Sequence, residues 1–179
     1  MRHLKVSFGF CAVICMLAWL DWHFCLRFLA CALCHELGHL FVMWLCHVKV
    51  CGISLTAAGA VIEVGICDNK REFLCALAGP VTGVLLGFAL LHNAPKTAMI
   101  SFLLSAVNLL PLYPLDGGRM LRALLGLWFA EDRIQRILHY VTIFVCCSLM
   151  FLACWGTVCL QMGLWPIFAA LVLLWRVGE

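Results

Sequence analysis

The sequence predicts an all-α integral membrane protein with about six transmembrane helices and a small membrane-associated β-hairpin after the second helix. Hydrophobic residues make up 65% of the 179 residues and charged residues 12%, against about 45–50% and 25% in soluble domains. The mean hydropathy is +1.07. A soluble core of this size cannot bury so much apolar surface, so lipid must cover it. We expect residues 1–179 to form a single membrane-embedded domain.

Apolar runs define the expected helices in chain order. The first apolar run follows basic residues, as the apolar part of a signal peptide does. It lacks a small-residue cleavage site followed by a polar region, so we interpret it as a membrane span. The fourth is short for a span of roughly 20 residues, because Pro111 and Pro114 end it early. The six expected spans cover about residues 6–20, 24–46, 73–91, 98–110, 137–155 and 158–175.

The polar interruption between the second and third runs has a pattern of its own. Residues 48–64 alternate between apolar and polar side chains, as a strand does, and Gly52 and Gly59 break the alternation. This pattern favours a small hairpin at or in the membrane, and an ordinary connecting loop explains it equally well. A hairpin here could bind an extended substrate by strand addition.

Basic residues orient the expected bundle. With the N-terminus in the cytoplasm, the Lys and Arg residues fall on inside loops or span edges, except for Arg27 and Lys96. This bias predicts a multi-pass protein of the cell membrane with both termini in the cytoplasm. The basic residues are scattered and the net charge is only +3, so no nucleic-acid partner is expected. Most of the 13 cysteines lie in apolar runs, where they behave as small hydrophobes.

The second run contains His35-Glu36-Leu37-Gly38-His39. On a helix the two histidines lie on one face, where both imidazoles can bind one metal ion, and Glu36 can act on a metal-bound water. Charged groups at the centre of a span cost roughly 2.5–3.5 kcal/mol on insertion scales. A metal in a water-filled cavity would compensate. The alternative is a pair of structural histidines, which we favour less because each would need its own buried partner.

Residues 108–119 read Asn-Leu-Leu-Pro-Leu-Tyr-Pro-Leu-Asp-Gly-Gly-Arg. A catalytic zinc site usually has three protein ligands, and a carboxylate is a natural third. Asp116 follows a proline-broken helix, whereas the other three aspartates lie in or near polar loops. Gly117 and Gly118 would let the chain turn tightly beside it. Asp116 could instead cap the next helix, but together with the histidines we favour a metal ligand.

A second motif overlaps the histidine motif. Cys31, Cys34 and His35 have the spacing of a c-type haem attachment site. Attachment needs an exposed segment on an oxidising side, and this segment lies within an apolar run. A haem would also leave Glu36 and His39 unexplained. We therefore expect the two cysteines to pack as small core residues.

Taken together, the two motifs resemble the site-2 protease family of intramembrane zinc metalloproteases, and Ala78-Gly79-Pro80 is similar to that family's small-residue signature. The short spans and the Asn-Leu-Leu-Pro variant are most similar to the bacterial stage IV sporulation protein FB group. The resemblance implies one Zn²⁺ ion, with Glu36 as the catalytic acid and base and Asn108 helping to hold the substrate or transition state. The implied metal ligands are His35, His39 and Asp116.

The resemblance also implies a function. We expect an intramembrane zinc endopeptidase that hydrolyses a peptide bond of a membrane-associated protein, and the sporulation group suggests a transcription-factor precursor in a bacterium. The expected partners are a membrane-tethered protein substrate, the lipid bilayer and a regulatory membrane protein. No PDZ or CBS domain is expected in these residues. The residue types alone do not separate zinc from another divalent metal.

The alternative from another class is a non-catalytic membrane metal-binding or carrier protein. A carrier would need polar residues along several spans and often has repeated halves. Here the polar residues converge on two segments and no repeat is seen. Glu36 discriminates the two hypotheses, because only an enzyme needs a proton-transfer group beside the ligands.

Overall fold

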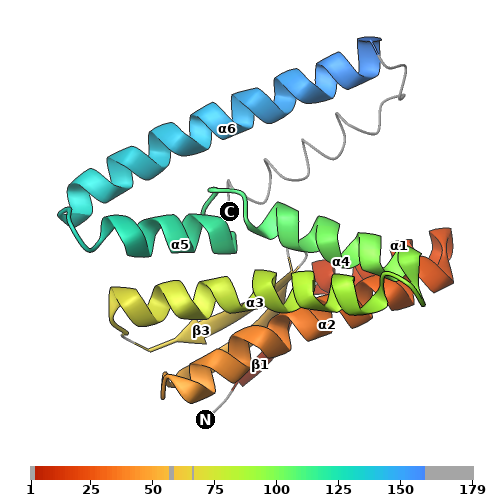
Figure 1. Cartoon of the computed structure of the whole chain (residues 1–179), viewed down its shortest axis with the longest axis horizontal. Coiled ribbons are helices and arrows are strands. Elements are labelled where there is room, and N and C mark those ends of the chain that lie inside the picture. Colours follow the sequence, from red (N-terminus) through yellow and green to blue (C-terminus); the bar gives the residue numbers. More distant parts are fainter. Residues whose placement is uncertain (1–2, 57–58, 66, 160–179) are drawn as a thin grey trace. The chain divides into compact units, whose positions relative to one another are not determined.

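The computed structural model describes residues 3–56, 59–65 and 67–159 (Figure 1). Backbone contacts divide the chain into one unit up to Leu109 and a second from Leu110. The first unit holds most of the elements. In chain order they are β1 (His3–Val6), α1 (Phe8–Leu20), α2 (Trp22–Leu45), β2 (Val50–Thr56), β3 (Gly59–Val64), α3 (Asn69–Leu90) and α4 (Pro95–Asn108). The second unit holds α5 (Asp116–Leu125) and α6 (Glu131–Cys159).

Five of the six expected apolar runs coincide with helices, namely α1, α2, α3, α4 and α6. The sixth, residues 158–175, lies almost wholly outside the described residues. Three described helices are long and apolar enough to cross a membrane by length and composition: α2, α3 and α6. At 1.5 Å per residue, α1 and α4 are only about 20 Å long, shorter than the roughly 30 Å hydrocarbon core. The expectation that each run spans by itself is therefore too generous for these two.

Two elements were not expected. Strand β1 covers residues that we assigned to the approach and start of the first span, and α5 covers residues in which we expected a tight turn. The sequence does not predict α5, because Gly117 and Gly118 lie in it and glycine is a poor helix former. In the structure both lie in the first turn of that helix. The expectation that they form a turn beside Asp116 is therefore wrong.

The sheet has the strand order β1-β2-β3. Strand β1 runs parallel to β2, with His3 opposite Gly52. Strands β2 and β3 run antiparallel, with Ile53 opposite Ile62, and the register shifts between Val50 and Gly52. Strands β2 and β3 lie within the segment whose alternation favours a hairpin. Because β2 is central, β1 and β3 provide the edges of the sheet.

A single residue, Asp21, connects α1 to α2. Its backbone N–H donates to the Leu17 carbonyl at the end of α1, at 3.0 Å. Its carboxylate caps α2 by accepting a hydrogen bond from the Phe24 N–H at 3.1 Å. This hydrogen bond to the charged form holds the pKa of Asp21 below its usual value. The cap therefore fixes the residue at which α2, the helix that carries the two histidines, begins.

Helices α2, α3 and α4 pack together through small residues, which let helix backbones approach closely. Gly38 of α2 faces Thr82 of α3, and Gly87 of α3 faces the Phe102 ring of α4. Buried hydroxyl groups add anchors between α3 and α4: Ser101 Oγ donates to the Gly83 carbonyl at 2.7 Å. This arrangement holds α3 firmly against the face of α2 that carries the histidine motif.

In the second unit, the segment before α5 folds back onto the helix. Leu112 and Leu115 are buried, and Leu115 is the N-cap residue of α5. A Cβ on Gly118 would lie 2.5 Å from the Leu112 carbonyl carbon and oxygen and from the Tyr113 nitrogen. The glycine is thus needed for a close backbone approach. This contact sets the position of Asp116 at the start of α5.

We expect Gly118→Ala to destabilise this segment. The gain in helix propensity is about 1 kcal/mol at most, whereas the added methyl group would collide with backbone that cannot move aside. Overpacking of this kind costs typically 1–3 kcal/mol, so thermal unfolding in detergent should occur at a lower temperature. Gly126→Ala is the matched control, because Gly126 ends the same helix with φ −64. Equal stability of the two variants would contradict the prediction.

Candidate metal centre

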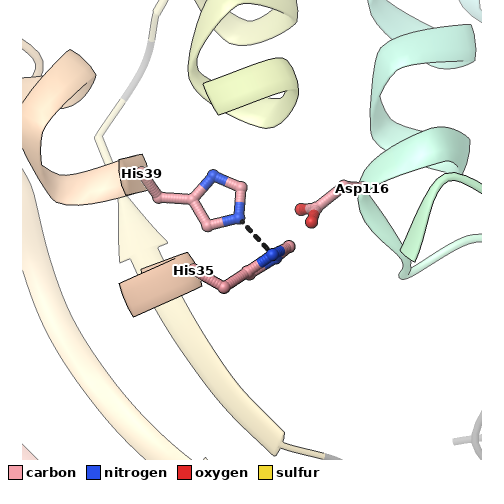
Figure 2. Close-up of side chains that lie close together, drawn as sticks. All are labelled: His35, His39 and Asp116. Atoms are coloured by element: carbon pink, nitrogen blue, oxygen red, sulfur yellow. Dashed lines mark hydrogen bonds between the residues drawn. The ribbon is translucent and has the colours of Figure 1, made fainter. Parts of the chain in front are cut away.

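His35 and His39 face each other on α2. Each side chain is buried, with 4% of its surface exposed. Their ring centroids are 4.9 Å apart and the ring planes cross at 81°. The two Nε2 atoms are 3.2 Å apart (Figure 2). Two ligands bound to one tetrahedral zinc ion are about 3.3 Å apart, given Zn–N bonds of about 2.0–2.1 Å, so this spacing fits a shared ion.

Helix α3 sets the tautomer of His39. The Nδ1 atom of His39 lies 2.7 Å from the Cys75 carbonyl oxygen. A carbonyl can only accept, so Nδ1 donates its proton, and in the neutral ring Nε2 carries the lone pair. The 3.2 Å contact between the two Nε2 atoms then places this lone pair beside His35 Nε2. The Cys75 carbonyl therefore holds His39 in the tautomer and orientation that a metal ligand needs.

Asp116 is the first residue of α5, with Leu115 as the N-cap. The aspartate therefore does not cap the helix, as the alternative interpretation required. Its side chain is buried, and Arg119 Nη1 lies 3.9 Å from its Oδ1 atom. The sequence does contain a signal for this contact, because an aspartate and an arginine three residues apart on a helix are neighbours.

One ligand atom from each of His35, His39 and Asp116 lies within 4.8 Å of the others (Figure 2). The donor set comprises two imidazole nitrogens and one carboxylate oxygen. It has the types and number of protein ligands that a catalytic zinc site uses, with a position left for water or substrate. The residues present therefore fit a zinc ion.

The other two expected site residues lie outside this group. Glu36 is half-buried on α2 and follows His35, so it projects about 100° further around the helix. Asn108 is the last residue of α4 and is buried, and its Nδ2 atom donates to the Leu104 carbonyl of the same helix at 3.1 Å. An amide nitrogen has two hydrogens, so Asn108 can still donate one further hydrogen bond.

The cysteines of the haem-like motif behave as packing residues. Cys31 is buried, and its thiol donates to the Thr97 carbonyl of α4 at 3.6 Å. Cys34 is half-buried on the same helix. Cys31 therefore belongs to the contact between α2 and α4, as a small core residue does.

Two contributions of α3 could not have been found from residue types. The carbonyl that orients His39 is a backbone group, which every residue offers, so only the packing of α3 on α2 singles out Cys75. Gly79 lies directly beside the two histidine rings. Its only signal in the sequence was its place in Ala78-Gly79-Pro80.

Several known proteins are similar to this chain. Residues 90–150 match the model of peptidase family M50. Stage IV sporulation protein FB of Bacillus subtilis is 30% identical over 158 residues, which cover 78% of this chain and 52% of that protein. A zinc metalloprotease of Methanocaldococcus jannaschii is 32% identical over 105 residues, which cover 51% of this chain and 31% of the relative. The chain thus spans about half or less of these relatives.

A solved structure has the same fold. The site-2 protease from Methanocaldococcus jannaschii superposes with a TM-score of 0.73 at 22% identity, covering 98% of this chain and 88% of that one. The family match includes Asn108 and Asp116. The histidine motif of α2 precedes it and is an independent observation.

Proposed function

Because the chain contains a peptidase family M50 domain of the site-2 protease kind, we propose that it is an intramembrane zinc endopeptidase that cuts a membrane-associated protein. The observation that carries the proposal is the buried group of His35, His39 and Asp116, whose ligand atoms lie within 4.8 Å of one another. These three residues hold one zinc ion. The similarity to a zinc metalloprotease of Methanocaldococcus jannaschii supports the same chemistry.

In this proposal each residue has a separate task. A zinc ion held by His35, His39 and Asp116 would supply a Lewis acid that lowers the pKa of a water molecule toward about 7. Glu36 accepts the proton of the attacking water and returns it to the leaving amine. Asn108 donates its remaining amide hydrogen to the substrate carbonyl, whose oxygen gains charge during attack. The Cys75 carbonyl keeps His39 in the ligand tautomer throughout.

The same proposal places the chain in the cell membrane. Helices α2, α3 and α6 have the length and composition of spans, and the excess of Lys and Arg on one side favours cytoplasmic termini. The sporulation relative suggests a bacterial transcription-factor precursor as the substrate and a regulatory membrane protein as a further partner. The buried ligand group would also serve a non-catalytic metal-binding protein, and the similarity to zinc metalloproteases favours the enzyme.

A substrate helix must be unwound locally before its peptide bonds can be attacked, and the sheet offers a way to hold the extended strand. Strand β3 lies at an edge of the sheet, where unpaired N–H and C=O groups can accept another strand. Successive N–H groups of a strand point to opposite sides, so either Val61 or Ile62 directs its N–H outward.

We expect proline at one of these two positions to lower cleavage without unfolding the protein. Val61→Pro and Ile62→Pro each remove one N–H group. The variant that loses the outward N–H should cut its substrate more slowly at an unchanged melting temperature, and the other should lose stability. Native cleavage rates in whichever variant keeps its stability would contradict strand addition.

The test of the proposed function is proteolysis by the purified full chain in detergent or bilayers. Candidate membrane-tethered proteins, including a transcription-factor precursor, serve as substrates. We expect cleavage that stops with a zinc chelator and returns when Zn²⁺ is added back. If the chain binds zinc stoichiometrically and cuts none of the substrates, the metal-binding alternative replaces the proposal.

A further inference from the structure

Gly79 of α3 lies where a side chain would meet both histidine rings of α2. A Cβ atom on Gly79 would overlap His39 Nε2 and would lie 2.5 Å from His39 Cε1 and 2.7 Å from His35 Nε2. Real Cβ atoms essentially never approach other heavy atoms closer than 3.0 Å. The φ angle of Gly79 does not lie in the left-handed region. Glycine is therefore required here because there is no space for a side chain.

The space that this Cβ would fill borders the ligand atoms of both histidines. A zinc ion bound to both Nε2 atoms lies about 2.0–2.1 Å from each of them. A methyl group in contact with the same two atoms competes with the ion for that volume. A side chain at Gly79 would therefore crowd the two ligand atoms that the ion needs.

We propose that Gly79 is a positioning residue that keeps the metal space between α2 and α3 open. The inference rests on the proposed function, because the ion concerned is the zinc ion of that site. A side chain at this position excludes the ion by occupying its volume and by pushing the imidazole rings apart. The Cys75 carbonyl, one helical turn earlier on α3, holds the opposite edge of the His39 ring through Nδ1.

Two further glycines on the same helix distinguish this role from ordinary helix packing. Gly83 and Gly87 follow Gly79 at intervals of four residues, and both face α4. A Cβ on Gly83 would overlap Ser105 Oγ, and one on Gly87 would lie 2.6–2.8 Å from atoms of the Phe102 ring. Neither has a histidine atom among its three nearest neighbours. Alanine at Gly87 thus disturbs packing without reaching the metal ligands.

The test compares the native chain with Gly79→Ala and Gly87→Ala, each purified in detergent, stripped with chelator and titrated with zinc or cobalt. We expect the native chain and Gly87→Ala to bind one ion and to show the visible absorption of tetrahedral Co²⁺. Gly79→Ala should bind zinc at least tenfold more weakly and lose that absorption. Native affinity and spectrum in Gly79→Ala would overturn the inference. If the native chain itself binds no metal, the proposed function fails instead.

A second measurement covers the case in which Gly79→Ala folds poorly. Because the methyl group would collide with the His39 ring, removing that ring should relieve the collision. Gly79→Ala should therefore lower the melting temperature of the metal-free protein by less in a His39→Ala background than in the native chain. An equal or larger fall in that background would show that the collision is elsewhere and would overturn the inference.

Discussion

Glu36→Gln is expected to abolish peptide-bond cleavage while leaving the zinc content unchanged. The glutamine has nearly the same shape as the glutamate and removes only the carboxylate that accepts the proton of the attacking water. Proton transfer by a positioned side chain contributes typically 10²–10⁴-fold to a rate, so the cleavage rate should fall by about that factor. Rates would be measured on a membrane-tethered substrate, and zinc by elemental analysis.

Glu72→Gln is the matched control for this prediction. Glu72 is a half-buried glutamate in the first turn of α3, and it lies outside the group of metal-binding side chains. Its loss should leave cleavage close to the native rate. If Glu36→Gln cleaved as fast as the native chain, Glu36 could not be the acid and base of the proposed mechanism.

Asp116→Ala is expected to remove zinc from the protein. Two histidines alone leave the ion with one protein ligand fewer than catalytic zinc sites use. Loss of a group that merely orients a ligand already costs 10–100-fold in metal affinity, so loss of the ligand itself should weaken binding by more than about 100-fold. Cleavage should fall in parallel, because without the ion no water is activated.

Asp132→Ala provides the comparison, since Asp132 is an exposed aspartate in the first turn of α6. Competition with a fluorescent zinc chelator would measure both affinities. This experiment also tests whether Asp116 and the two histidines bind the same ion in solution. Zinc affinity that is equal in Asp116→Ala and the native chain would contradict the proposed ligand set.

The sequence predicts the parts of the site that depend on local spacing. His35 and His39 are four residues apart in an apolar run, and on any helix that spacing puts them on one face. Asp116 stood out because prolines precede it and because the two motifs together resemble a known family. The carboxylate was therefore identified from its context as well as from its residue type.

Other features could not be predicted because they depend on packing between distant segments. Which backbone carbonyl orients His39 follows only from the position of α3 against α2. Helix α5 was missed because two consecutive glycines are unfavourable in a helix, and the close contact of Gly118 with the preceding turn explains the second of them. Strand β1 was missed because its four residues gain a partner only when β2 lies beside them. The local sequence pattern does not indicate which distant segments will pair.

The ion pair between Asp116 and Arg119 has a consequence for how the protein is assembled. A buried carboxylate without a counter-charge would oppose folding until a metal arrived. The guanidinium, 3.9 Å away, gives that carboxylate a neighbouring positive charge from the moment α5 forms. This segment can therefore fold before a metal binds, because its folding does not bury an unpaired carboxylate.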